Sequence, residues 1–200
     1  MRPRHREKTA RLPWPNGSAE NFRSPSPAER LRAEGLVEST RAEDRRQWKE
    51  GREVTTREVA AALVQAVEEA LPRLRCIPDE ASTDVRPGGR WCRREILGHL
   101  VDSAVNNQQR FVRVQEDAPL ALPNYAQEHW VRSQGYADRS WGHLVPLWEA
   151  LNRHLAHVLD RAPEEMASRR LVIGEQETTL GAVAESYVTH LRHHLDQILG

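Results

Sequence analysis

The sequence predicts an all-α fold, a four-helix bundle preceded by a disordered N-terminal extension. Within residues 52–200, four segments repeat apolar residues at helical spacing, and no clear alternation of apolar and polar residues indicates a strand. Before residue 52, five prolines and many arginines occur among few scattered apolar residues. A segment of that composition cannot bury enough apolar surface to offset the entropy lost on ordering.

The N-terminal extension, residues 1–51, is interpreted as a disordered basic tail rich in proline and arginine. Residues 1–52 hold 13 Lys+Arg against 8 Asp+Glu, whereas the whole 200-residue chain balances 29 against 29. The tail could be a basic arm that binds RNA or an acidic partner, or an inert extension, and its composition favours the inert alternative. Residues 52–200 are expected to form the bundle domain.

Several function classes are disfavoured by composition. A net charge of zero gives no global footprint of a nucleic-acid or membrane-surface protein. No apolar run approaches the roughly 18 residues of a membrane span. No apolar segment follows the basic N-terminus, so a secretory signal is not expected. The two cysteines, Cys76 and Cys92, lack metal-binding or disulfide spacing, which favours reduced thiols in a cytoplasmic protein.

The first two helices have recognisable starts. Thr55 and Glu58 form a capping box, in which each side chain satisfies a free backbone N–H of the other residue. The second helix is expected over Trp91–Gln115, after the breaker at residues 87–89. Cys92 lies at its N-cap position, where serine or threonine is usual, and this should weaken the cap by about 1 kcal/mol.

The third and fourth helices are expected over Ser140–Asp160 and Thr179–Leu199. Pro146 should start or kink the third helix. The link at 117–139 is long enough to cross the bundle and join parallel neighbours, whereas a short link would force antiparallel ones. Residues 171–174 are a candidate for a short extended segment.

The densest group of chemically active side chains lies in the fourth helix. His190 and His194 are spaced i, i+4, so their rings lie one above the other on the same face, where two imidazoles can bind one ion. At about 100° per residue, both fall on or beside the apolar stripe of that helix. His193 falls about 120° from the centre of the stripe and should face solvent.

A third ligand must come from another segment. His99 is the best candidate, although it lies at the edge of a broad apolar arc in the second helix, and periodicity supports it weakly. His154 and His157, spaced i, i+3, are a competing pair that could equally be surface residues. The pattern alone leaves both alternatives open.

These residues also carry a family resemblance. The run GHLVDS at 98–103, the run HLRHHLDQI at 190–198 and the aromatic and amide residues between 125 and 155 occur in the order typical of the DinB/YfiT-like superfamily. The chain resembles that superfamily over about residues 52–200. The resemblance implies a four-helix bundle of up-down-down-up topology. It also implies a divalent metal held by His99, His190 and His194.

The resemblance further implies an enzyme, because relatives include metal-dependent hydrolases and S-transferases that use low-molecular-weight thiols. Three protein ligands leave a coordination position open, which is typical of catalytic metal sites. Imidazole ligands suit zinc, nickel or iron, and the sequence does not choose among them. We therefore expect a small-molecule substrate and, in the transferase case, a thiol cosubstrate. The alternative is a non-catalytic bundle that binds metal, a ligand or a protein partner, with a homodimer as one arrangement.

No catalytic acid or base is evident beside the ligands. Asp102 and Gln197, each about one turn from a candidate ligand, could orient the ligands or bound water, or could be ordinary polar residues. The remaining candidates would line a pocket, although for the aromatic ones core packing is the favoured interpretation. These pocket candidates are Asn106, Gln109, Tyr125, Trp130 and Tyr187.

Overall fold

The computed structural model describes residues 54–85, 89–116 and 119–200, so the predicted disordered tail lies outside the described residues. The helices are α3 (Thr56–Arg75), α4 (Arg93–Arg113), α5 (Gln127–Gln134), α6 (Trp141–Arg161) and α7 (Leu180–Leu199). Short 3₁₀ turns lie at η1 (Glu80–Thr83), η2 (Tyr136–Asp138) and η3 (Glu164–Ser168). Helices α3, α4, α6 and α7 are the four predicted ones, and the ends predicted for the last three agree within two residues.

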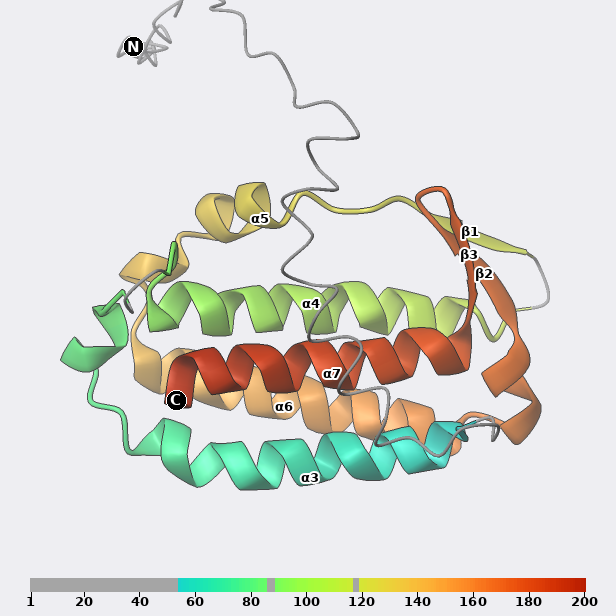
Figure 1. Ribbon diagram of the computed structural model, residues 1–200, viewed down its shortest axis with the longest axis horizontal. Coiled ribbons are helices and arrows are strands. Elements are labelled where there is room, and N and C mark those ends of the chain that lie inside the picture. The colour runs from blue at the N-terminus through green and yellow to red at the C-terminus, as the bar shows by residue number, and fades with distance from the viewer. Residues whose placement is uncertain (1–53, 86–88, 117–118) are drawn as a thin grey trace, which may run out of the picture. The chain divides into compact units, whose positions relative to one another are not determined.

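The four long helices form the predicted bundle. Helices α3 and α7 run in one direction along it, and α4 and α6 run in the other (Figure 1). Helix α6 packs against both α3 and α4, and α7 packs against both α4 and α3. The topology is therefore up-down-down-up. The parallel pair α4 and α6 is joined by a long crossover segment that includes residues 119–139. Within the described residues, no helix combines the length and apolar character needed to span a membrane.

A small three-stranded sheet was largely missed by the sequence prediction. Its order is β1 (Leu120–Leu122), β2 (Arg170–Ile173) and β3 (Gln176–Thr179), with β1 parallel to β2 and β2 antiparallel to β3. Only β2 coincides with the segment expected to be extended. Gly174 opens the two-residue turn between β2 and β3 with a φ of 62°, a conformation that glycine adopts without strain.

The predicted capping box of α3 is present, whereas Pro146 does not start α6. The capping box of Thr55 and Glu58 is present. At Cys92, the carboxylate of Glu95 accepts the backbone N–H at 2.9 Å, so one free donor of α4 is satisfied by this glutamate. Pro146 does not start the third helix, because α6 begins at Trp141 and continues through the proline.

Helix α4 stands out in the core because it carries most of the buried polar residues found in the described part of the chain. The core itself is made of leucine, valine, alanine and aromatic side chains from all four long helices. Buried polar groups are costly unless they find partners. Five of them come from this one helix, namely Arg94, His99, Asp102, Ser103 and Asn107. This concentration of costly buried groups makes α4 a candidate location for a functional site.

Candidate metal centre

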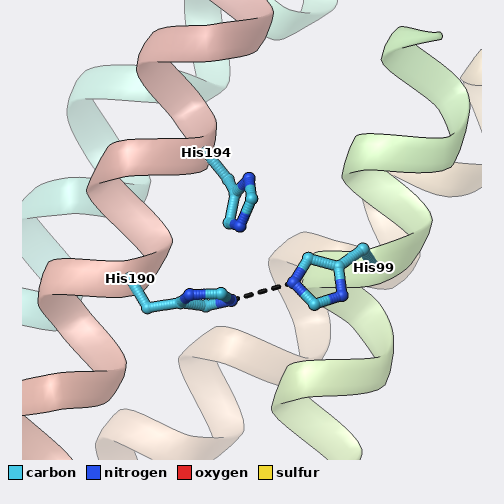
Figure 2. A group of neighbouring side chains, drawn as sticks. All are labelled: His99, His190 and His194. Carbon is cyan, nitrogen blue, oxygen red and sulfur yellow. Dashed lines mark hydrogen bonds between the residues drawn. The ribbon is translucent and has the colours of Figure 1, made fainter. Parts of the chain in front are cut away.

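Three imidazole rings meet between α4 and α7. His99 comes from α4, and His190 and His194 come from successive turns of α7 (Figure 2). Their ring centroids lie 5.0 Å (His99–His190), 4.8 Å (His99–His194) and 4.5 Å (His190–His194) apart. The Nε2 atoms of His99 and His190 are 2.9 Å apart, a hydrogen-bond distance.

The convergence follows from helix geometry. The i, i+4 spacing stacks the two α7 rings on one face, and that face packs against α4. His99 is fully buried, whereas His190 and His194 are half-buried, so the cluster is closed on the side of α4 and less covered on the side of α7. His99, which periodicity supported weakly, is thus brought together with the pair that the apolar stripe indicated.

Burial keeps all three imidazoles neutral near pH 7. Desolvation, reinforced by repulsion from His194, lowers the pKa of His99 to about 3. Desolvation and the neighbouring histidines lower the pKa of His190 to about 2. Desolvation lowers the pKa of His194 to about 4, although its hydrogen bond to Gln197 opposes that shift. Each ring therefore retains a nitrogen lone pair.

The donor set fits a divalent cation. Imidazole nitrogens that bind one zinc ion at about 2.0–2.1 Å cannot lie more than roughly 4.2 Å from one another. One ligand nitrogen from each of the three rings lies within 4.8 Å of the others, so small ring rotations suffice to bring all three to one ion. Neutral imidazoles suit zinc, nickel and iron alike.

Gln197 contacts one of these rings from the outside. Its Oε1 lies 2.8 Å from Nδ1 of His194, and its Nε2 lies 2.9 Å from Nε2 of His193. An amide oxygen only accepts, so in this arrangement Nδ1 of His194 carries the proton and Nε2 offers its lone pair. His193 is exposed, as its position on the helix predicted.

Asp102 is held by the crossover rather than by a histidine. Its Oδ1 accepts hydrogen bonds from the hydroxyl of Tyr136, at 2.7 Å, and from the side-chain amide of Gln134. Burial raises the pKa of Asp102, and these two donors oppose the rise. Burial and the nearby carboxyl raise the pKa of Tyr136, so its hydroxyl keeps the proton that it donates.

Gly98 makes room for this contact. A Cβ atom at Gly98 would overlap the ring of Tyr136, because the ring lies directly on the helix backbone there. The same tyrosine therefore contacts the residue before His99 and hydrogen-bonds Asp102, three residues after it. Gln134 and Tyr136 were not singled out as site residues by the sequence, because they lie in short helical turns of the crossover, where periodicity gives no clear signal.

The predicted pocket residues lie in different surroundings. The side chain of Asn106 donates to the backbone carbonyl of Asp102, and Gln109 is exposed. Tyr125 and Trp130 are half-buried with ring centroids 5.2 Å apart. Their role in a pocket stays a prediction.

Tyr187 lies in the packed core, where it donates to Asn152 and contacts the ring of Phe111. Its role in a pocket also stays a prediction. Trp91, which was not among the candidates, places its ring 5.3 Å from that of His99. The competing pair, His154 and His157, is exposed on α6 and takes no part in the cluster.

Comparisons with known proteins agree with the architecture. Residues 62–198 match the family model of the DinB superfamily. A solved structure, described as YfiT from Bacillus subtilis, a probable metal-dependent hydrolase with an unusual four-helix bundle topology, is similar with a TM-score of 0.55 and 22% sequence identity. The match covers 92% of each chain, and at this identity it shows a shared fold. A search of curated proteins finds no match.

Proposed function

The chain belongs to the DinB superfamily, and from that membership we propose that it is a divalent-metal-dependent enzyme acting on a small molecule. The reaction would be a hydrolysis or the transfer of a low-molecular-weight thiol. The three converging imidazoles are the observation that carries the proposal. The description of YfiT as a probable metal-dependent hydrolase supports the same class of chemistry.

The number of ligands favours catalysis over a structural role. Among the residues that the structure describes, the cluster comprises three histidines and no cysteine or carboxylate joins it. Structural zinc sites are usually closed by four protein ligands, whereas catalytic sites keep a position for water or substrate. The half-buried state of His190 and His194 leaves a side of the cluster from which a small molecule could approach.

The residues of this chain would share the work as follows. His99, His190 and His194 would hold the cation, which lowers the pKa of a water or thiol bound to it. Gln197 would keep His194 in the tautomer that offers Nε2 to the cation. The cluster includes no carboxylate among the described residues. Since a cation would lower the pKa of either bound group, this absence does not choose between hydrolysis and thiol transfer.

The alternative is a non-catalytic bundle that binds a metal or a ligand, and the missing base also agrees with it. The identity of the metal, the thiol cosubstrate, a homodimer and a cytoplasmic location all stay predictions. Turnover distinguishes an enzyme from a binder.

The experiment is to load the purified protein separately with Zn²⁺, Ni²⁺ or Fe²⁺. Each preparation is then assayed with activated esters, and with a panel of thiols plus an electrophilic acceptor. We expect metal-dependent turnover that His194→Ala abolishes and His154→Ala, an exposed control on α6, retains. Equal rates with and without metal on every substrate would favour the binder.

A further inference from the structure

Two buried polar atoms on α4 have no hydrogen-bond partner among the described residues and lie on residues one turn apart. They are Nδ1 of His99 and Oδ2 of Asp102. The two residues are 0% and 1% exposed, so bulk water does not compensate either atom. Leaving such a buried atom unpaired is costly, and each case calls for an explanation.

The two atoms are chemically complementary. Nε2 of His99 faces His190 at 2.9 Å, and Nδ1 lies on the other side of the ring (Figure 2). A neutral imidazole that offers the lone pair of Nε2 carries its proton on Nδ1, which is then a donor. The free carboxyl oxygen of Asp102 is an acceptor. Side chains three residues apart on a helix are neighbours, with Cβ atoms about 5–6 Å apart.

The crossover fixes the carboxyl group from the opposite side. Tyr136 and Gln134 both donate to Oδ1, which leaves Oδ2 as the oxygen without a partner. The ring of Tyr136 can approach because Gly98 has no side chain. The carboxyl group is therefore held in place by groups outside α4 before any cation is bound.

We propose that Asp102 is the positioning residue of the metal centre: its Oδ2 accepts the Nδ1–H of His99 when His99 binds a cation. Its Oδ1 meanwhile stays anchored to Tyr136 and Gln134. This inference rests on the proposed function, since it assumes that His99 is a ligand. It adds that the crossover, residues 119–139, sets the orientation of that ligand through a single carboxyl group. An acceptor that takes a hydrogen bond from the second ring nitrogen of a ligating histidine fixes the tautomer of the ring and raises its basicity.

The test is the affinity of the full chain for Zn²⁺, measured by competition with a chelator. We expect Asp102→Ala to weaken binding about 10–100-fold, the loss usual when such an acceptor is removed. Asp102→Asn, which retains an acceptor oxygen of lower charge, should lose less. Tyr136→Phe keeps the carboxyl group but removes one anchor, and it should also weaken binding.

Asp79→Asn is the matched control. Asp79 likewise links α4 to another element, because its carboxylate accepts from Arg94 of α4 and from the backbone N–H of Trp141 at the start of α6. It is not part of the histidine cluster. If the carboxyl groups contributed only to the stability of the fold, replacing either Asp79 or Asp102 would weaken Zn²⁺ binding. The proposal instead predicts parent-like Zn²⁺ affinity in Asp79→Asn.

Nuclear magnetic resonance gives a signal that reports on the proposed hydrogen bond between His99 and Asp102 and not only on whether the protein is folded. In the Zn²⁺-loaded protein labelled with ¹⁵N-histidine, the Nδ1–H of His99 should give a signal protected from exchange, and Asp102→Asn should shift it or expose it to exchange. Unchanged affinity and an unchanged signal in Asp102→Asn and Tyr136→Phe would overturn the proposal. Should His99→Ala retain Zn²⁺ at parent affinity, the ligand assignment itself fails, which is a separate result.

Discussion

The Nε2 atoms of His99 and His190 lie 2.9 Å apart although 91 positions separate the two residues in the chain. The contact exists because α4 and α7 are antiparallel neighbours in the bundle (Figure 1). The side chains of both residues point toward each other across the space between the two helices (Figure 2). A hydrogen bond between two of these neutral imidazoles uses the lone pair of one ring only. A cation between the three rings would instead use one lone pair from each of them.

Acid should destabilise the metal-free protein through these histidines. Their pKa values in the folded chain lie below the usual 6.5, at about 3 for His99, about 2 for His190 and about 4 for His194. The unfolded chain therefore binds protons first as the pH falls. The free energy of unfolding should be level above about pH 7 and should decrease steadily below about pH 6.5.

Urea unfolding of the metal-free protein between about pH 8 and pH 5 measures this dependence. The exposed His154→Gln variant should show the same decrease, since it leaves the buried cluster intact. A variant with His190 and His194 both replaced by glutamine should show a much shallower one. A parent protein equally stable across this range would contradict the assignment of buried neutral imidazoles.

Replacement of Gln197 should weaken metal binding without unfolding the bundle. Gln197→Ala removes the acceptor of Nδ1–H on His194, and we expect Zn²⁺ affinity to fall by about tenfold or more. Its side chain is exposed, so the free energy of unfolding should change by less than about 0.5 kcal/mol. Gln65→Ala, which removes an exposed glutamine on α3, is the control and should bind Zn²⁺ like the parent. Equal affinities in the two variants would remove Gln197 from the site.

Gly98→Ala should be destabilising despite the better helix propensity of alanine. The added Cβ would overlap the ring of Tyr136, and the ring would have to move away from Asp102. Overpacking of this kind costs about 1–3 kcal/mol. Gly142→Ala in α6 is the control, because a Cβ there meets nothing within 4 Å. Thermal or urea unfolding should show that control to be equal to the parent or more stable by up to about 1 kcal/mol. A Gly98→Ala protein as stable as the parent would show that the tyrosine ring moves freely.

Sequence periodicity was sufficient for the four long helices and for the pair on α7. The apolar stripe of α7 is narrow enough to place His190 and His194 on the buried face and His193 outside. The stripe of α4 is broad, since every residue from Ile96 to Ala104 is buried, and such a helix gives no sharp direction for His99. His99 was the best candidate with only weak support from periodicity, and the family resemblance was what implied it as the third ligand.

Tertiary contacts determined what the sequence did not reveal. Strands of three and four residues are too short for an alternating pattern, so β1 and β3 left no signal. The partners of Asp102 are Gln134, at the end of the short helix α5, and Tyr136, in the 3₁₀ turn η2. They lie some thirty residues from Asp102 in the chain, and elements this short carry no clear periodic pattern. Gly98 could have been suspected, because a glycine within a buried helical segment often marks a close approach by another group.

The metal content of the protein tests the central claim most directly. The full chain and its His99→Ala, His190→Ala and His194→Ala variants are incubated with Zn²⁺, desalted and measured by elemental mass spectrometry. Three convergent imidazoles predict about one Zn²⁺ per parent chain and a loss of most of it in each variant. His99→Ala retaining a full equivalent, with only the α7 variants losing metal, would contradict a centre built between α4 and α7.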